Sequence, residues 1–411
     1  MRILFVCQYF APEPGAPQAR LLETGRALAR AGLEVAVLTG FPNHPTGILA
    51  AGDRGRLFRR ERMDDVEVLR TWLFATPNRG FGRKTLGHLS FMASAMLLGG
   101  ARARRPDVVV ASSPTFFGAI AGWVLSVRWR VPFVFEVRDL WPAIFTQLGV
   151  LERGWLVRAL EFVELFLYRR AAKVVTVTEG FRKDISSRGI DAGKVVTITN
   201  GVDTVRFHSG GDAGEARREL GLQGKFVILY LGAHGVSHAL GKILDVAGRW
   251  VDDPSALFLF VGEGAEKDEL VSRARAAGLL NVRFTGAVPR ERVPLFYRAA
   301  DVGLVPLRDV PLFSAFIPSK MFELLSAGVP IVASLRGEPA EILDRSGGAV
   351  VVPPEDVTAI DAALRRLRRD PAERRRMAAR GVEFVRRNYD RAALAMRYAD
   401  VLRAAVREGR R

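Results

Sequence analysis

Cysteine is almost absent from this sequence. Cys7 is the single cysteine among 411 residues. One thiol cannot form an internal disulfide, which excludes the class of small secreted domains held together by disulfides and favours a reducing, cytoplasmic setting. Cys7 lies in the apolar run ILFVC, so we expect a buried small side chain rather than a reactive thiol.

Long hydrophobic runs are also absent. The longest nearly uncharged run, residues 114–127, has 14 residues, whereas a membrane-spanning helix needs roughly 18 to 20. The chain opens directly into MRILFVC, without the longer apolar stretch and small-residue cleavage site of a signal peptide. We therefore expect a cytoplasmic protein without a transmembrane segment.

Lysine is scarce, although the chain is strongly basic. Only eight of the 61 basic residues are lysines, and the formal net charge is +17. Residues 51–105 hold 12 Lys and Arg against 5 Asp and Glu, and residues 365–411 hold 16 against 6, so these two segments account for the whole excess. Such a surface suits nucleic acid, anionic lipid headgroups or a phosphorylated substrate, or is simply solvated. Because lysine is rare in this arginine-rich chain, the lysine at position 320 suggests a specific role rather than general surface charge.

Short apolar runs alternate with helical stretches along both halves of the chain. Runs that are apolar on both faces predict parallel strands buried between layers of helices. The expected strands of the first half are residues 2–10, 34–40, 65–72, 107–113, 132–137 and 173–178. Those of the second half are residues 225–233, 256–264, 282–288, 301–307, 330–334 and 349–352. The sequence thus predicts an α/β protein with two doubly wound, Rossmann-like domains.

The domain limits follow from the stretch between the two series. Residues 203–224 are rich in Gly, Asp and Arg, and we expect the linker there. The predicted domains are residues 1–205, 206–385 and a C-terminal segment, 386–411. The spacing of apolar residues in the tail predicts one long amphipathic helix.

Polar loops follow the expected strands, at the edge where such sheets bind ligands. The first strand ends in CQYFAPEPGAPQAR, which lacks the G-x-G-x-x-G pattern of a nicotinamide or flavin site and has only Gly15. Gly15 is either an anion- or sugar-binding position before a helix or a plain turn glycine. The loops GFPNHPTG, ASSPT, RDLWP and TNGVD follow other strands, although Asp139 of RDLWP is equally a helix-capping residue.

The second half places YLGAHG and VGEG directly after strands, where glycines let a backbone approach a ligand closely. His234 is predicted to face a phosphate, to cap a helix or to face solvent. Farther along, IPSKMFELL begins a helix with Lys320 and Glu323 in its first turn. The pair is either a surface ion pair or a site for a diphosphate and a ribose.

Together these segments resemble glycosyltransferase family 4, whose members are retaining enzymes of the GT-B fold that use nucleotide sugars. The resemblance covers nearly the whole chain. It is carried by QYFAPEPGAPQAR, VRDLWP, ITNGVDTVRF, VGEGAEKDEL, VRFTGAVPRERVPLFYRAADVGLVPL and IPSKMFELLSAGVPIVAS. PNHPTG, RDLWP and IPSKMFE resemble the branch with L-fucosamine-type transferases of O-antigen and capsule assembly.

The resemblance implies two facing domains, with the C-terminal helix crossing back to the first. The C-terminal domain would bind the nucleotide sugar, with Lys320 at the diphosphate and Glu323 at the ribose. It also implies an acceptor side and catalytic positions: Gly15, Asn43, Arg138 and Asp139 line the first domain, and Asp139, Lys320 and Glu323 are the candidate catalytic residues. The other implied donor-side residues are Gly232, His234, Gly235, Gly264, Gly286, Val288, Phe316, Ile317, Pro318 and Ser319.

Three departures from the family pattern bear on the donor. Ala315 stands where the family usually has a first glutamate, so the usual contact with the donor's sugar hydroxyls is either lost or replaced by backbone groups of Phe316 and Ile317. Ala233 and Ala239 stand where Arg and Lys are frequent, and Ser112-Ser113 replaces a frequent histidine. Lys320, with His234, would then supply most of the positive charge at the phosphates, and the sugar would be one such as a deoxy or N-acetylated hexose.

The resemblance therefore implies metal-independent, cofactor-free transfer from a UDP-sugar to a glycan or a polyprenyl-diphosphate-linked acceptor in surface polysaccharide biosynthesis. The basic segment 51–105, with Phe58, Trp72, Phe74, Phe81 and Phe91, is predicted to contact an anionic membrane at its inner face. Two alternatives remain: a UDP-sugar epimerase of the same architecture and, more distantly, a basic nucleic-acid-binding protein, for which no binding signature is present.

Overall fold

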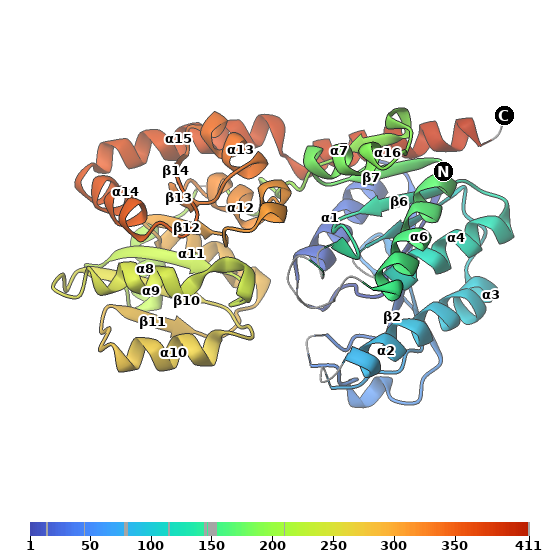
Figure 1. The fold of residues 1–411 in the computed structure, drawn as a ribbon, viewed down its shortest axis with the longest axis horizontal. Helices are drawn as coiled ribbons and strands as arrows, with labels where there is room; N and C mark the ends of the chain where they lie inside the picture. Colours follow the sequence, from blue (N-terminus) through green and yellow to red (C-terminus); the bar gives the residue numbers. More distant parts are fainter. Residues whose placement is uncertain are drawn as a thin grey trace. The chain divides into compact units, whose positions relative to one another are not determined.

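The strands of the chain form two separate sheets. A computed structural model describes residues 1–13, 15–44, 46–77, 81–113, 116–143, 146, 154–208 and 210–409. The chain divides into unit 1, Met1–Asn200 with Arg391–Arg411, and unit 2, Gly201–Asp390. Each unit contains one sheet with its own helices (Figure 1).

The sheet of unit 1 has the order β3-β4-β2-β1-β5-β6-β7-β8. All pairs other than β3–β4 are parallel. Because the chain moves outward from β1 in both directions, the carboxyl ends of β1 and β5 form the switch point at which such sheets bind ligands. The parallel strands are β1 Arg2–Val6, β2 Glu34–Gly40, β4 Val66–Thr71, β5 Val108–Ser112, β6 Phe133–Val137, β7 Lys173–Thr176 and β8 Val195–Thr197.

Strand β3, Phe58–Met63, was not among the expected strands. Its sequence, FRRERM, is mostly charged and half exposed, and it pairs antiparallel with β4 at the edge of the sheet. An edge strand that is open to water does not need the apolar run by which buried parallel strands are recognised. The strands that were expected are parallel as predicted, and the antiparallel β3 is an additional edge strand that the sequence did not predict.

Helices cover both faces of the unit 1 sheet. On one face, α1 and α16 pack together, and Leu394, Tyr398 and Leu402 of α16 enter the same core as Cys7, which is buried as expected. On the other face, α2 and α4 pack through Phe91 and Leu125. The helices are α1 Ala16–Arg30, α2 Phe81–Ser94, α3 Gly100–Arg102, α4 Phe116–Trp129, α6 Trp155–Arg170, α7 Glu179–Ser187 and α16 Arg391–Glu408.

The sheet of unit 2 has the order β11-β10-β9-β12-β13-β14 and is wholly parallel. Its switch point lies between β9 and β12. All six strands expected in the second half are present. They are β9 Phe226–Leu231, β10 Ala256–Val261, β11 Val282–Thr285, β12 Val302–Pro306, β13 Ile331–Ser334 and β14 Ala349–Val352.

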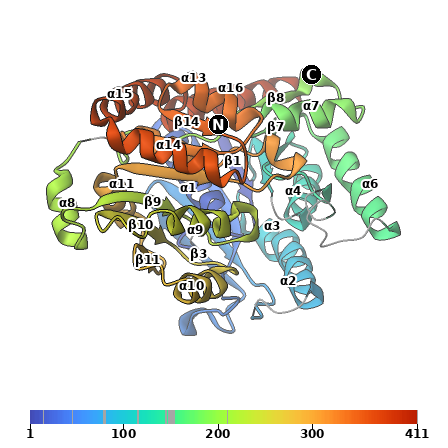
Figure 2. The ribbon, with the colours of Figure 1, turned by 60° about the vertical axis from the view of Figure 1, so that its left-hand side comes forward.

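Two cores lie on the two faces of the unit 2 sheet. Helices α9, α10 and α14 pack on one face (Figure 2), and α8, α11, α12, α13 and most of α15 on the other. The helices are α8 Ala213–Leu220, α9 Leu240–Gly248, α10 Lys267–Ala276, α11 Val293–Ala299, α12 Lys320–Ser326, α13 Glu338–Ser346, α14 Val357–Arg369 and α15 Pro371–Asn388. The expected linker, residues 203–224, contains α8 instead, because Ala216 and Leu222 are buried in this core.

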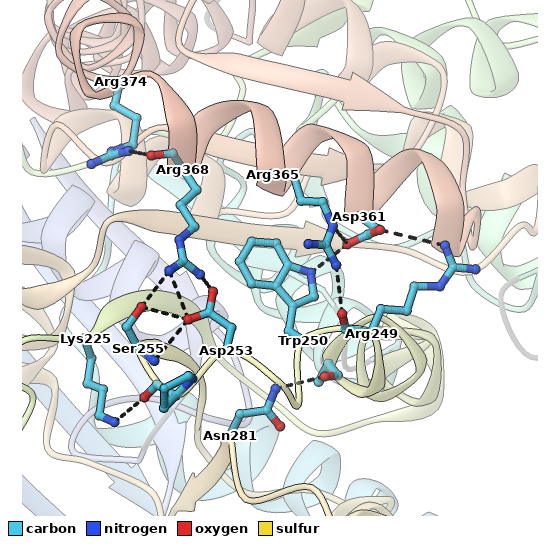
Figure 3. Close-up of polar contacts among 12 residues, drawn as sticks. Lys225, Arg249, Trp250, Asp253, Ser255, Asn281, Asp361, Arg365, Arg368 and Arg374 are labelled. Atoms are coloured by element: carbon cyan, nitrogen blue, oxygen red, sulfur yellow. Dashed lines mark hydrogen bonds and ion pairs between the residues drawn. The ribbon is translucent and has the colours of Figure 1, made fainter.

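A polar cluster joins α14 to the amino-terminal edge of the unit 2 sheet (Figure 3). Trp250 Nε1 donates to Asp361 Oδ1 at 2.6 Å, and Arg365 Nε donates to the same oxygen at 3.0 Å. Arg368 donates to Ser255 Oγ at 2.6 Å and to Asp253 Oδ1 at 3.0 Å, just before β10 begins. This cluster connects α14 to the amino-terminal edge of the sheet. The loops described below lie at the opposite, carboxyl-terminal edge.

The described helices are too short or too polar to cross a membrane. Within the basic segment 51–105, Phe91 is fully buried in the core beneath α2, so its expected contact with lipid is wrong. Phe58 packs against the same core, and the side chain of Phe81 lies outside the described residues. Trp72 and Phe74 are exposed at 37% and 38%.

Candidate functional site

Two glycine-containing loops lie in backbone contact at the carboxyl edge of unit 2. Gly232 follows β9 with a φ of 148°, and Gly262 follows β10 with a φ of 139°. A Cβ atom on Gly262 would lie 2.0 Å from the carbonyl oxygen of Gly232, and one on Gly264 would lie 2.3 Å from that of His234. Side chains at these positions would force the loops apart, so the glycines are required by the close approach.

Lys320 points into the first of these loops. A Cβ atom on Gly232 would lie 2.6 Å from Lys320 Nζ, and Nζ itself lies 3.9 Å from the centre of the Tyr230 ring. Lys320 Nζ is buried and has no hydrogen-bond partner among the described residues. Burial lowers the pKa of Lys320 to about 7, against a smaller opposing effect of Glu323. An ammonium group held in this way is poised for an anion.

Glu323 has partners of its own. The Tyr297 hydroxyl donates to Glu323 Oε2 at 2.9 Å, and Arg290 Nη2 lies 3.4 Å from Glu323 Oε1. The ion pair between Lys320 and Glu323, one of the two predicted arrangements, is not among the ion pairs of the described residues. Because a carboxylate oxygen can accept more than one hydrogen bond, Glu323 retains the capacity to accept from a ligand hydroxyl.

His234 is fully buried, which excludes the solvent-facing arrangement, and the short turn that follows it has no side-chain capping bond, which excludes the helix-capping arrangement. Its ring lies among those of Tyr230, Phe260 and Phe284, at centroid distances of 5.8, 6.3 and 6.1 Å. Burial lowers the pKa of His234 to about 4, so the ring is neutral at pH 7. The lowered pKa argues against the expectation that His234 adds positive charge. Both ring nitrogens lack a hydrogen-bond partner among the described residues.

The turn after β11 is held by Glu263. A Cβ atom on Gly286 would lie 3.2 Å from Glu263 Oε1, and the backbone N–H of Ala287 donates to the same carboxylate. The side chain of Val288 is partly buried against the core of unit 2. Gly235, also expected at the site, begins the short 3-10 turn Val236–His238 and has open space where a Cβ would lie.

The segment before α12 passes through a 3-10 turn, Pro311–Ala315. Ile317 and Pro318 are buried, and the Phe316 N–H donates to Phe313 O at 3.2 Å. Backbone groups of Phe316 and Ile317 were expected to replace the glutamate that Ala315 lacks. The N–H of Phe316 is not available for this, because it already donates within the turn. Ser319 precedes α12 without a side-chain capping bond.

In unit 1, Gly15 and Arg138 lie near the switch point. Gly15 caps α1 with a φ of 145°, and the side chain of Gln18 lies where a Cβ would stand. Arg138 follows β6, and its Nη1 donates to Pro17 O at 3.0 Å. Burial lowers the pKa of Arg138 to about 10, against an opposing effect of Glu136. Gln18, Ser113 and Arg138 line a small cavity of about 30 Å³.

Asn43 and Asp139 are placed differently. The Asn43 side chain donates to Phe41 O at 2.9 Å and thus shapes its own loop. Asp139 is half-buried, and burial raises its pKa while Arg138 lowers it. Asp139 follows Arg138 at the end of β6, whereas Asn43 follows β2, and Asn43 does not line the small cavity. In the described part of the chain no cluster of three His, Cys, Asp or Glu residues is arranged to hold a metal ion.

Two family models match the chain, one in each unit. Residues 15–201 match the glycosyl transferase 4-like domain, and residues 212–384 match the glycosyl transferases group 1. The chain is a family 4 glycosyltransferase. This confirms the predicted family and the predicted class of enzyme.

The curated relatives of this glycosyltransferase carry names that refer to different products. A Bacillus subtilis glycosyltransferase named for teichuronic acid biosynthesis is 28% identical over 49% of this chain, and the match spans half of that protein's own length. A glycogen synthase of Mycobacterium tuberculosis is 26% identical over 99% of this chain and 95% of its own. These names do not single out one substrate.

The solved structures support the fold of the glycosyltransferase. The Anabaena protein HepE, solved in complex with UDP and glucose, superposes with a TM-score of 0.73 at 19% identity, over 98% of this chain and 99% of that one. Two Rossmann-like parallel sheets and a C-terminal helix on α1 make this the GT-B fold, as predicted.

Several residues near the carboxyl edges of the two sheets were not identified from the sequence of the glycosyltransferase. In unit 1, the buried Glu13 accepts the backbone N–H groups of Phe10, Asn43 and His44, and His88 Nδ1 lies 2.5 Å from Gln8 Oε1. In unit 2, the missed residues are Arg290 and Tyr297. Both lie within VRFTGAVPRERVPLFYRA, a segment from which only the Gly286–Val288 turn was chosen.

Proposed function

We propose that this glycosyltransferase transfers a sugar, with retention of configuration, from a UDP-sugar held by unit 2. The observation that carries the proposal is the position of Lys320 Nζ, which is buried beside the Gly232 loop without a hydrogen-bond partner in the described part of the chain. A lysine with a pKa near 7 is costly to keep unless a function uses it. A donor diphosphate supplies the missing anion, and charge-assisted bonds to phosphate are among the stronger ones.

The other residues proposed to contact the donor lie at the same carboxyl edge of the unit 2 sheet. Glu323 accepts the ribose hydroxyls, and the backbone of the Gly286–Val288 turn faces the base. Gly232, Gly235 and Gly264 let the two loops cover the phosphates, and His234 lies beneath them as a neutral ring. Backbone groups of Phe316 and Ile317, other than the Phe316 N–H that donates to Phe313 O, contact the sugar in place of the carboxylate that Ala315 lacks.

The chemical step needs no protein nucleophile in this proposal. The bond between C1 of the sugar and the β-phosphate oxygen breaks while the acceptor oxygen bonds to C1 on the same face. A phosphate oxygen takes the acceptor's proton, and UDP leaves. Lys320 stabilises the charge that develops on the leaving diphosphate. Metal-independent and cofactor-free transfer stays a prediction, which turnover in the presence of a chelator tests.

The acceptor is assigned to unit 1. Gly15 and Arg138 flank the switch point, Asn43 shapes the loop after β2, and Asp139 orients the acceptor or the sugar. The acceptor proposed is a glycan or a polyprenyl-diphosphate-linked sugar of surface polysaccharide biosynthesis, from the L-fucosamine-type branch that PNHPTG, RDLWP and IPSKMFE resemble. The Bacillus subtilis relative named for teichuronic acid supports a cell-surface pathway.

A lipid-linked acceptor would bring the protein to the inner face of a membrane. Trp72 and Phe74 are exposed, and the Phe74 N–H donates to Ser90 Oγ at 2.8 Å, which places this loop against α2. Leu86 and Leu89 of α2 are exposed at 50% and 38%. These side chains and the basic segment 51–105 are suited to an anionic bilayer. Co-sedimentation with vesicles that does not rise with anionic lipid content would refute this placement.

A panel of UDP-, GDP- and dTDP-sugars, screened by thermal shift and then turned over with membrane-lipid acceptors, tests the proposal. UDP-sugars should stabilise the protein, and transfer should require an acceptor. An epimerised sugar and free UDP without any acceptor would instead identify the epimerase alternative. Stabilisation by none of the sugars would overturn the proposal. The nucleic-acid-binding alternative rested on net charge alone. It is not needed, because glycosyltransferase family models match both units of the chain.

A further inference from the structure

Lys320 and Glu323 lie one helical turn apart, a spacing at which opposite charges ordinarily pair. In the structure Lys320 Nζ instead lies over Tyr230, while Glu323 contacts Arg290 and Tyr297. The surroundings of Glu323 therefore determine whether the lysine is available to a ligand.

Arg290 and Tyr297 are themselves fixed in place. Tyr297 lies on α11 and is 1% exposed, and burial keeps its pKa well above the usual value, so its hydroxyl remains a donor. The Arg290 guanidinium carbon lies 5.5 Å from the centre of the Phe207 ring, which in turn lies 6.0 Å from the Tyr297 ring. Phe207 is fully buried, so it provides a rigid support for both residues.

A guanidinium and a buried hydroxyl together bind a carboxylate more strongly than a lysine one turn away does. Glu323 is thus drawn toward α11 and the β11–α11 loop, away from Lys320. Glu323 still raises the pKa of Lys320 through its charge, but less than burial lowers it, and it makes no ion pair with Lys320 among the described residues. The groups closest to Lys320 are the Tyr230 ring and the neutral rings of His234 and His238, whose pKa values burial lowers to about 4 and about 3. None of these three rings carries a negative charge that could neutralise the ammonium.

We propose that Arg290 and Tyr297 are positioning residues that hold the Glu323 carboxylate and thereby leave Lys320 unpaired for the diphosphate of the donor. This inference rests on the proposed function, because it takes the diphosphate as the partner of Lys320. It adds that the affinity for the diphosphate depends on two residues that touch Glu323 rather than the phosphates.

The test compares the binding of UDP and of uridine by calorimetry. The ratio of the two affinities isolates the contribution of the diphosphate, because both ligands share the base and the ribose. In the double variant Arg290→Met/Tyr297→Phe, Glu323 is free to pair with Lys320, and the ratio should fall about tenfold, as expected for a charge-assisted contact of ~1.4 kcal/mol. Proton uptake on UDP binding at pH 8 should fall with it, because a paired Lys320 is already protonated.

A third substitution separates positioning from a general loss of structure. Adding Glu323→Gln to the double variant removes the carboxylate that competes for Lys320, so the ratio should return to near the wild-type value. Arg292→Met is the matched control: Arg292 lies two residues from Arg290, is half exposed and pairs with Glu219, and its loss should leave the ratio unchanged.

The outcomes are distinct. An unchanged ratio and unchanged proton uptake in the double variant would overturn this inference while leaving the donor site intact, provided that Lys320→Ala weakens UDP binding. A low ratio that Glu323→Gln does not restore would also overturn it. A wild-type protein that does not bind UDP would instead refute the proposed function.

Discussion

Lys320 is the residue on which the donor site depends. Its ammonium is buried beside Gly232, with no hydrogen-bond partner among the described residues, and its pKa is lowered to about 7 by burial. A bound diphosphate would favour the charged form and raise this pKa again. The site is therefore sensitive to pH in a range where its two neighbouring histidines stay neutral.

The pH dependence of UDP binding follows from this shift. Below about pH 6, one unit under its pKa, Lys320 is almost fully charged in the free protein, and its contribution to affinity is complete. Above pH 7 the free protein loses this proton and binding must restore it, so the affinity should fall by up to about tenfold per pH unit until the pKa of the bound state is reached. Calorimetry at pH 8 in two buffers of different ionisation enthalpy should show proton uptake.

Lys320→Met provides the control, because it removes the titrating group but keeps much of the side-chain volume. The proton uptake should then fall to the part that UDP itself contributes. Equal apparent enthalpies in both buffers for the wild-type protein would contradict the assignment of the low pKa to the donor site.

At the scale of elements, α14 is fixed to the sheet by the cluster in Figure 3. Asp361 accepts hydrogen bonds from Trp250 Nε1 and Arg365 Nε, and Trp250 is 2% exposed. Asp361→Ala leaves the buried indole N–H unsatisfied, so we expect the free energy of unfolding of unit 2 to fall by about 1 to 3 kcal/mol. Urea denaturation monitored by the fluorescence of Trp250 in a variant without the other tryptophans would measure this.

Arg376→Ala is the control for Asp361→Ala, since Arg376 is exposed and has one surface ion pair, with Asp370. Its effect should stay within about 0.5 kcal/mol. UDP affinity should be unchanged in Asp361→Ala, because the cluster lies at the amino-terminal edge of the sheet. A tenfold loss of UDP affinity would contradict the separation of the two edges.

The same elements show how far the sequence predicts the fold. Buried parallel strands such as β9 and β10 were predictable, because both of their faces must be apolar. Strand β3 and helix α8 were missed, since an exposed edge strand and a polar helix buried mainly through Ala216 resemble loop sequence. Lys320 was identifiable because it follows a strand of the second series and lysine is rare. Arg290 and Tyr297 were not, because their role depends on a tertiary contact with Glu323.

At the scale of the whole molecule, the end of the chain completes the core of unit 1. Leu402 of α16 is fully buried in the core that also contains β1, β2 and α1. Leu402→Ala should lower the free energy of unfolding of unit 1 by about 2 to 5 kcal/mol, the usual cost of a cavity in a core. Tryptophan fluorescence follows this transition, because five of the six tryptophans lie in unit 1.

Met396→Ala on the same helix is the matched control, since Met396 is 37% exposed and its loss creates little cavity. It should change the transition by less than about 1 kcal/mol. Equal effects of the two substitutions would contradict the structural role of α16.

The central claim is that Lys320 binds the diphosphate of a nucleotide sugar. The most direct measurement is the affinity for UDP of Lys320→Ala, beside that of Lys242→Ala, which removes an exposed lysine from α9. Lys320→Ala should weaken binding at least about tenfold and depress turnover with the donor, as the loss of a charge-assisted contact requires. Lys242→Ala should bind like the wild-type protein. Wild-type affinity and turnover in Lys320→Ala would show that the lysine is not part of the donor site.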